Sequence, residues 1–240
     1  MAGILYIVPT PVGNLEDITA RALRVLREAD LILAEDTRTS GVLMRHFGIE
    51  TPMRSYHKFN EHQVLSSVRD ILSGGRHVAL VSDAGTPGIS DPGFLLVRAC
   101  AAEGIEVQTL PGATACIPAL VSSGLPCDRF CFEGFLPRKG RRSRLEQLCA
   151  EERTLVFYES PYRVKDTLSE LSEVFGPDRP ASVAREISKI HETHRRGTLS
   201  ELAAYYAEHE AKGECVLVVG GLPAPPPEKK IHKNKYRMDA

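Results

Sequence analysis

The sequence predicts an α/β protein with two α/β domains, the first built on a mainly parallel sheet and the second on a mixed sheet. Three observations lead to this prediction. Short apolar runs in the first half alternate with segments that have apolar residues at helical spacing. Apolar runs in the second half follow one another more directly. Ser, Gly and Pro cluster at 122–127, which is typical of a domain boundary.

The first half predicts four strands and four helices. The strands are expected at 4–8, 31–34, 78–81 and 107–110. The helices are expected at 19–29, from Asn60 to about 72, from Asp91-Pro92 to about 103, and at 113–122. Thr19, Asn60 and Asp91 are residue types that cap helix N-termini. Strands this apolar, separated by helices, indicate a parallel sheet that is covered on both faces.

The second half predicts five strands and two helices. The strands are expected at 130–135, 154–158, 181–187, 190–196 and 215–219, and the helices at 164–175 and 199–209. We therefore expect domains at 1–122 and 123–222. Residues 223–240 begin with a proline run, which excludes a helix, and continue with lysines, so we expect a mobile, extended basic tail.

Composition excludes some classes of protein. The formal net charge is −1, so any nucleic-acid binding must come from a local patch. The sequence shows neither a bilayer-spanning apolar run nor a signal-peptide pattern, and we expect a cytoplasmic protein without a membrane association. None of the six cysteines forms a C-x-x-C pair and no H-E-x-x-H occurs, so we expect no metal.

Three loops that follow predicted strands are rich in small residues, at 9–14, 82–93 and 110–115. Glycine lets the backbone approach a ligand closely, and backbone N–H groups bind carboxylate or phosphate oxygens. Each loop alone could be a simple tight turn. Three of them at the carboxyl ends of parallel strands favour a cofactor cleft. The usual dinucleotide fingerprint and the P-loop are both missing.

Several longer motifs carry a resemblance. They are YIVPTPVGNL at 6–15, AEDTR at 34–38, SDAGTPGISDPG at 82–93, ESPYR at 159–163, REISKIHE at 185–192, RGTL at 196–199 and KGE at 212–214. Over about 4–221 the chain resembles the ribosomal RNA small subunit methyltransferase I family of the tetrapyrrole-methylase superfamily. Tetrapyrrole methylases usually carry a Gly-x-Gly-Pro-Gly first loop, whereas this chain has Pro9-Thr10-Pro11-Val12-Gly13, which favours the ribosomal branch. Tyr162 stands where histidine is common.

The resemblance implies a fold, a reaction and partners. It implies two α/β domains with S-adenosylmethionine in the cleft between them, and a homodimer. The implied reaction is 2′-O-methylation of a cytidine in the decoding region of 16S ribosomal RNA, in the small ribosomal subunit. Two alternatives stay open: a tetrapyrrole C-methyltransferase, which needs no basic patch, and a ribosome-binding factor that does not catalyse.

The superfamily resemblance also implies the cofactor contacts. They are Val12, Ala84, Gly85, Thr86, Ile89, Thr114 and Ala115, with Glu159 and Glu186 of the second domain closing over the cofactor. Backbone N–H groups of 84–86 would bind the methionine carboxylate. Small side chains at Ala113 and Ala115 would leave room for adenosine. The alternative for each residue is a packing role.

A ribose hydroxyl is weakly acidic, so a base that takes its proton would assist the transfer. We favour Asp36, which ends the second strand and resembles the position of an acidic residue in related methylases. Alternatively, Asp36 pairs with Arg38 and braces the loop. His57 and Lys189 are the other candidates.

Contact with RNA requires local positive charge. Arg138, Lys139, Arg141, Arg142 and Arg144 place five cations within seven residues. The alternative for this cluster is the solvated start of a helix. Three further arginines end or follow strands and are candidates for gripping phosphates nearer the target: Arg38, Arg163 and Arg185.

Overall fold

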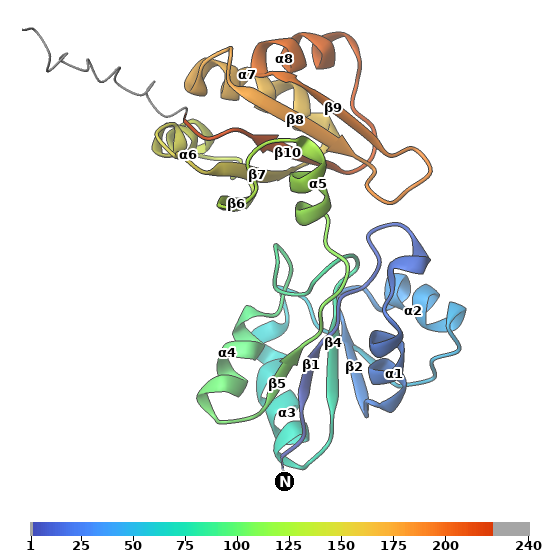
Figure 1. Ribbon diagram of the computed structural model, residues 1–240. Helices are drawn as coiled ribbons and strands as arrows, with labels where there is room; N and C mark the ends of the chain where they lie inside the picture. Colours follow the sequence, from blue (N-terminus) through green and yellow to red (C-terminus); the bar gives the residue numbers. More distant parts are fainter. Residues whose placement is uncertain (1, 223–240) are drawn as a thin grey trace, which may run out of the picture.

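A computed structural model describes residues 2–222 of the chain. Met1 and residues 223–240 lie outside the described residues, and with them the predicted basic tail. Two five-stranded sheets, each with its own helices, follow one another along the chain (Figure 1). Two α/β units, one parallel and one mixed, are what the sequence predicts.

Each half of the chain is made of short strands and helices. The first half contains β1 (Leu5–Ile7), η1 (Leu15–Asp17), α1 (Ala20–Glu28), β2 (Leu31–Ala34), α2 (Thr37–His46), β3 (Met53–Ser55), α3 (Glu61–Ser73), β4 (Val78–Val81), α4 (Phe94–Ala102), β5 (Val107–Thr109) and α5 (Cys116–Ser123). The second half contains β6 (Phe130–Phe135), α6 (Arg141–Leu148), β7 (Thr154–Glu159), η2 (Pro161–Arg163), α7 (Val164–Phe175), β8 (Pro180–Arg185), β9 (Thr193–Thr198), α8 (Leu199–Glu208) and β10 (Cys215–Val219).

The first sheet has the order β3-β2-β4-β1-β5, and all its strands are parallel. Side chains alternate between its two faces, so each face has its own apolar cluster. Ile32 and Ala79 pack toward α1 and α2. Leu33 and Leu80 pack toward α3 and α4. The result is the helix–sheet–helix arrangement that the apolar strands predict.

Besides the one-turn η1, two elements of the first half are absent from the prediction. α2 follows β2 directly, and β3 pairs with β2 at the edge of the sheet. β3 has three residues, one of which is the exposed Arg54. An edge strand this short and this polar has no apolar run by which the sequence would reveal it.

Two predicted helix starts need correction. α4 begins at Phe94 after Gly93, not at Asp91-Pro92, because Gly93 adopts a backbone conformation with φ of 150° that breaks the helix. Asn60 does lie at the N-cap of α3, but its side chain does not cap the helix. Instead its Oδ1 accepts a hydrogen bond from the His57 N–H at 2.8 Å, and its Nδ2 donates to the Ser55 carbonyl.

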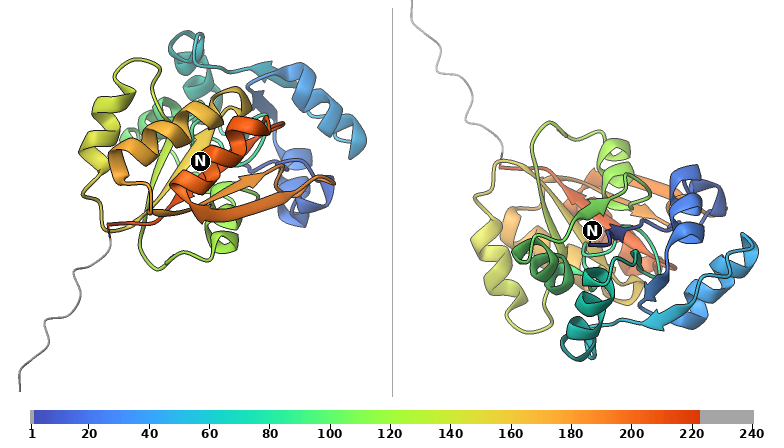
Figure 2. Two further views of the ribbon diagram at one scale, coloured as in Figure 1. Left: turned by 90° about the horizontal axis from the view of Figure 1, so that it is seen from above. Right: turned by 90° about the horizontal axis from the view of Figure 1, so that it is seen from below.

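The second sheet has the order β6-β7-β10-β8-β9. β6 and β7 are parallel, and the other pairs are antiparallel, so the prediction of a mixed sheet is confirmed. One face packs against α6, α7 and α8. In the left view of Figure 2, α7 and α8 (gold and orange) lie across the strands. Among residues 2–222, no helix is long and apolar enough to cross a membrane.

α5 packs on the other face of the second sheet. Its Ala119 and Leu120 are buried against Val156, Ala184 and Val218. The predicted division between residues 122 and 123 would separate most of this helix from the sheet that it covers. The packing supports a division nearer 111–115, and the domain limits themselves stay a proposal.

Candidate functional site

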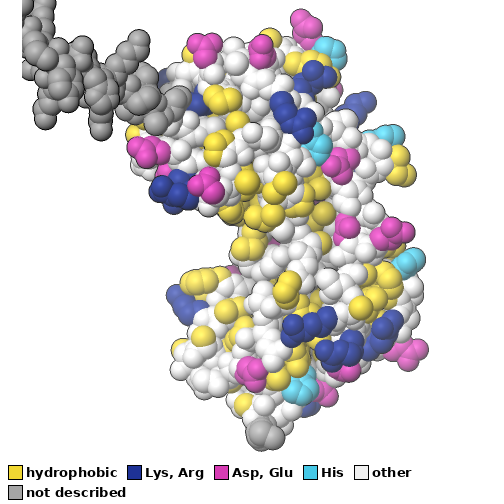
Figure 3. Space-filling view, in the orientation of Figure 1, with side chains coloured by type: hydrophobic (Ala, Val, Ile, Leu, Met, Phe, Trp, Pro, Cys, Tyr) yellow, Lys and Arg dark blue, Asp and Glu magenta, His cyan; other side chains and the backbone are white. Residues whose placement is uncertain are grey.

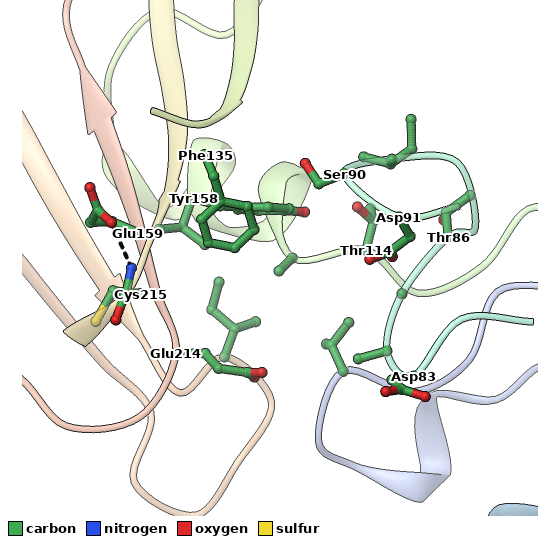
Figure 4. A pocket seen from close by; sticks show the side chains of 18 of the residues that line it. Asp83, Thr86, Ser90, Asp91, Thr114, Phe135, Tyr158, Glu159, Glu214 and Cys215 are labelled. Carbon is green, nitrogen blue, oxygen red and sulfur yellow. Dashed lines mark hydrogen bonds between the residues drawn. The ribbon is translucent and has the colours of Figure 1, made fainter. Parts of the chain in front are cut away.

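A cavity of about 470 Å³ lies between the two sheets, at the carboxyl ends of the parallel strands. The first sheet contributes loops that follow β1, β4 and β5, and Glu35 directly after β2. The second contributes the end of β7 and the start of β10, together with Phe135 and Ile187. Side chains from the two sheets face each other across the cavity (Figure 4). A cavity of this size fits a small-molecule ligand.

The three small-residue loops hold one another in place. Thr10 and Gly85 exchange two backbone hydrogen bonds of 2.9 Å, which join the first loop to the second. The Thr86 hydroxyl donates to the Ala113 carbonyl at 3.1 Å, which joins the second loop to the third. Gly85 adopts a φ of 80°, where a side chain would be strained. The loops therefore form one rigid wall of the cavity.

The Gly85 N–H is not free to bind a ligand, because it donates to Thr10. The prediction that all of residues 84–86 offer ligand-binding N–H groups therefore needs correction. Within residues 2–222 the N–H groups of Ala84 and Thr86 donate to no other residue. These two groups are the ones available for a carboxylate.

Eight of the nine predicted cofactor residues line the cavity. They are Val12, Ala84, Gly85, Thr86, Ile89, Thr114, Ala115 and Glu159. Glu186 is the exception, because its carboxylate accepts hydrogen bonds from the Lys189 ammonium at 2.8 Å and from the Glu214 N–H at 2.9 Å. It borders a separate depression on the second domain. Whether the eight bind a cofactor stays a prediction.

Glu159 is buried, and its charge is already satisfied. The Ser160 N–H donates to it at 2.8 Å, the Thr167 hydroxyl donates at 2.7 Å, and the Arg163 guanidinium lies 3.4 Å away. A buried carboxylate with three partners holds its surroundings in place. It therefore anchors η2 at the edge of the cavity, in addition to lining it.

Contacts between the sheets close the cavity on two sides. On one side, the Ser90 hydroxyl lies against Gly134, where a Cβ atom would stand 2.9 Å from it. β6 has an irregular register there, and Gly134 adopts a φ of 60°. On the other side, the Ser188 hydroxyl donates to Asp17, and the Lys189 side chain packs over Gly13.

Asp36 does not line the cavity. It is the N-cap of α2, where its Oδ1 accepts from the Arg38 N–H at 2.8 Å, and it forms an ion pair with the Arg38 guanidinium at 2.6 Å. Hydrogen bonds from Arg38 lower the pKa of Asp36 to about 2. A carboxylate with so low a pKa is a weak proton acceptor. The structure thus forms the bracing pair that the sequence left open as the alternative.

The other two candidate bases lie elsewhere. His57 follows β3, does not line the cavity, and accepts from the Phe59 N–H through Nδ1 at 3.3 Å. Lys189 forms ion pairs with Glu186 and Glu214 at 2.8 and 2.9 Å. Burial lowers the pKa of Lys189, but these two hydrogen bonds outweigh it and the pKa is raised. A protonated Lys189 cannot accept a proton.

Besides Glu214, which pairs with Lys189, three carboxylates that the sequence analysis did not assign to the site line the cavity: Glu35, Asp83 and Asp91. Burial raises the pKa of all three and is the largest cause in each case. The pKa of Asp91 is raised to about 7, because the neighbouring carboxylates Glu35 and Asp83 add to the effect of burial. These carboxylates do not form a metal site: within residues 2–222, no group of three or more His, Cys, Asp or Glu side chains is placed to hold a metal ion. Their position directly after β2 and β4 is the signal that could have found Glu35 and Asp83.

The predicted RNA-binding cations differ in whether they border a common groove and in whether they have an acidic partner. Arg138, Arg141, Arg142 and Arg163 border one open groove beside the cavity. Three of the cluster have acidic partners: Arg141 pairs with Glu170, Arg142 with Glu173 and Glu146, and Arg144 with Glu133. Arg138 and Lys139 form no ion pair within the described part of the chain.

Arg38 and Arg185 lie away from that groove. Arg38 is on the first domain in its pair with Asp36. The Arg185 guanidinium donates to the carbonyls of Lys212 and His191 and borders two other depressions of the second domain. The structure therefore brings together only part of the predicted set.

Two domains with a cavity at the carboxyl ends of the first sheet are the arrangement of a known class of protein. That class is the tetrapyrrole methylases, because the family model described as "Tetrapyrrole (Corrin/Porphyrin) Methylases" matches residues 4–203. Solved structures share the fold. Cobalt precorrin-4 methyltransferase superposes with a TM-score of 0.67 at 19% identity, covering 90% of this chain and 94% of that one. Uroporphyrin-III C-methyltransferase from Thermus thermophilus, complexed with S-adenyl homocysteine, gives 0.64 at 21%, covering 91% and 97%.

Curated relatives are more similar. "Ribosomal RNA small subunit methyltransferase I" of Pseudomonas aeruginosa is 52% identical over 99% of this chain and 86% of its own length. The protein of the same name from Escherichia coli O157:H7 is 52% identical over 91% of this chain and 78% of its own length. The chain belongs to the ribosomal RNA small subunit methyltransferase I family, within the tetrapyrrole methylases.

Proposed function

We propose that this protein transfers the methyl group of S-adenosylmethionine to a ribose 2′-hydroxyl of small-subunit ribosomal RNA. The target that the family resemblance implies is a cytidine in the decoding region of 16S RNA. The observation that carries the proposal is the cavity between the sheets, walled by the three loops whose motifs the family shares. The names of the relatives support an RNA substrate over a tetrapyrrole.

The cavity suits S-adenosylmethionine chemically. The cofactor carries a methyl group activated on a positively charged sulfonium, and also bears an ammonium, a carboxylate and an adenosine. Glu35, Asp83 and Asp91 provide negative charge toward the cations. The N–H groups of Ala84 and Thr86 suit the carboxylate. The small and apolar side chains of the cavity leave room for a purine.

The chain has two tasks in such a transfer. It must align the two reacting groups, which the rigid loops and the closing contacts at Gly134 and Gly13 would do. It must also accept one proton from the hydroxyl. We infer that Asp91 accepts it, since this carboxylate lines the cavity and its pKa of about 7 is close to the working pH. Asp36 is tied to Arg38 and would act only through the loop that it braces.

Labelled methyl transfer tests the proposal. The protein is incubated with labelled S-adenosylmethionine and, separately, small ribosomal subunits from a strain lacking its own enzyme, the naked 16S RNA, and uroporphyrinogen III. We expect label in ribosomal RNA and none in the macrocycle. Label in the macrocycle alone would support the tetrapyrrole alternative. Cofactor binding without transfer to any of the three would support the non-catalytic factor.

Two further properties follow as proposals. One is a location in the cytoplasm, where a small-subunit substrate would be met.

The other is a homodimer, which the family resemblance implies. The exposed apolar Ile117 and Val121 of α5 support a contact with a partner. In Figure 3, hydrophobic side chains gather at the lower part of the upper domain, where Figure 1 draws α5. Light scattering that gives the mass of a monomer at micromolar concentration would contradict the dimer.

A further inference from the structure

A second hollow adjoins the cofactor cavity on the second domain. It is an open groove of about 730 Å³, and Phe135 and Ser160 line both it and the cavity. A chain lying in the groove would therefore have direct access to the cavity. The proposed function gives this groove no role beyond its arginines.

Two aromatic side chains in the groove are exposed. Tyr162 is 92% exposed and Phe135 is 56% exposed. Burial of such rings in the core would stabilise the fold, so their exposure suggests a partner surface. The Phe135 ring lies 5.6 Å from that of Tyr158, which lines the cavity. In Figure 4, Phe135 and Tyr158 stand side by side at the second-domain wall.

The segment that presents Tyr162 is held firmly. Tyr162 lies in η2, between Ser160, whose N–H donates to the buried Glu159, and Arg163. The Arg163 guanidinium pairs with Glu159 and donates to the Leu136 carbonyl at 3.1 Å. These bonds tie η2 to the end of β6. The backbone that carries the exposed ring is thus held in place, which lowers the entropy that the segment loses on binding.

Four arginines and one glutamate border the groove. Arg141 pairs with that glutamate, Glu170, and Arg142 and Arg163 pair with glutamates that lie outside the groove lining. Arg138 has no acidic partner within residues 2–222. Cations beside exposed rings match a single-stranded nucleic acid, which offers phosphates and flat bases together. An apolar peptide would match the rings but not the arginines.

We propose that this groove binds the nucleotide adjacent to the one that is methylated. Its base stacks on Tyr162, with Phe135 at the entrance to the cavity, and its phosphate pairs with Arg138. The proposal rests on the proposed function, because it assumes an RNA substrate in the cavity. It adds that the enzyme requires the neighbour of the target to be unpaired but accepts any base there, since every base can stack on an aromatic ring.

Substitutions at Tyr162 test the stacking. We expect Tyr162→Ala to raise KM for the RNA substrate about tenfold, the scale of one lost base–aromatic stack, and to leave cofactor affinity unchanged. Tyr162→Phe and Tyr162→His keep a flat ring and should stay within about threefold of the parent. Phe59→Ala removes another exposed ring, outside the groove, and is the matched control. An equal loss in Tyr162→Ala and Tyr162→Phe would overturn stacking, because the hydroxyl would then be the binding group.

Fluorescence gives a readout that does not depend on activity. The chain has no tryptophan, so Tyr162→Trp introduces a single reporter. A short single-stranded RNA of the target sequence should quench it, and a duplex of the same sequence should quench it less. If the parent methylates RNA while Tyr162→Ala keeps the parent KM and the reporter is not quenched, the groove proposal is wrong and the proposed function stands. If the parent methylates no RNA, the proposed function itself fails.

Discussion

Asp36 and Asp91 lie near the same edge of the first sheet but in opposite environments. Asp36 is half-buried outside the cavity and paired with Arg38, which lowers its pKa to about 2. Asp91 lines the cavity, where burial and the neighbouring Glu35 raise its pKa to about 7. The two aspartates therefore separate the role of a proton acceptor from the role of a helix cap.

Single-turnover rates distinguish these roles. With saturating cofactor, we expect Asp91→Asn to slow methyl transfer about 100-fold, the usual contribution of a general base. Asp36→Asn should stay within about threefold, since an asparagine still caps α2. Calorimetry of cofactor binding is the control: Asp36→Asn should bind the cofactor like the parent, and the saturating cofactor compensates for any loss of affinity in Asp91→Asn. A parent-like rate in Asp91→Asn, with a large loss in Asp36→Asn, would restore Asp36 as the base.

The raised pKa of Asp91 also affects stability. The unfolded chain releases this proton near pH 4 and the folded chain near pH 7, so the group's favourable contribution is complete below pH 4 and is lost as the pH rises through 7. Asp91→Asn removes the cost of a buried charge. Thermal unfolding should therefore show a higher melting temperature for the variant than for the parent at pH 8, and a much smaller difference at pH 4. Equal differences at both pH values would contradict the burial of this carboxylate.

At the residue scale, the sequence predicts which residues line the cavity better than it predicts which carboxylate is free to accept a proton. The small residues of 82–93 locate the cavity wall, and eight of nine predicted contacts line it. Which carboxylate is free depends on side-chain partners that only the fold brings together. Arg38 reaches Asp36, whereas Asp91 is enclosed by segments far apart in the chain.

At the scale of elements, β6 closes the cavity through its irregularity at Gly134. We expect Gly134→Ala to cost about 1–2 kcal/mol, because a φ of 60° disfavours a side chain, and to weaken cofactor binding because the new Cβ displaces Ser90. Gly104→Ala is the matched control, with a φ of 69° and open space around its Cβ. Unfolding in urea and cofactor calorimetry are the measurements. If both variants bind the cofactor like the parent, the closing contact has no role in binding.

The loop before α6 carries the charge that is available for RNA, at Arg138 and Lys139. We expect the double variant Arg138→Glu, Lys139→Glu to weaken binding to the small subunit and to flatten its dependence on salt, by about one unit of slope for each phosphate that the variant no longer binds. Arg142→Glu is the comparison, since its guanidinium is already paired with Glu173 and Glu146. Filter binding across a salt series measures both. A slope unchanged by the double variant would contradict an RNA contact at this loop.

Elements were predictable where apolar residues mark them. β2, β4 and β10 have the predicted bounds because each is a buried apolar run. The hairpin of β8 and β9 was misplaced by up to three residues. Glu186 and Ser188 adopt positive φ values of 55° and 64° and end the strand, and no residue type there signals such a turn.

At the scale of the whole molecule, the order of the strands could not be predicted from the sequence. β4 lies between β2 and β1, and β10 lies at the centre of the second sheet although it is last in the chain. No local pattern encodes which strands pair. The cleft could be predicted, because parallel strands place their loops at one edge. Its closing wall comes from a second domain whose placement the pattern did not reveal.

The cavity, as we propose, directs a methyl group to a ribose oxygen of small-subunit RNA. The most direct test is alkaline hydrolysis of the RNA after reaction with the protein and S-adenosylmethionine, using subunits from a strain lacking its own enzyme. A 2′-O-methyl group removes the nucleophile for cleavage at that nucleotide, so we predict one missing band, at a cytidine of the decoding region. A complete ladder from RNA that carries the label would place the methyl group on a base and contradict the account.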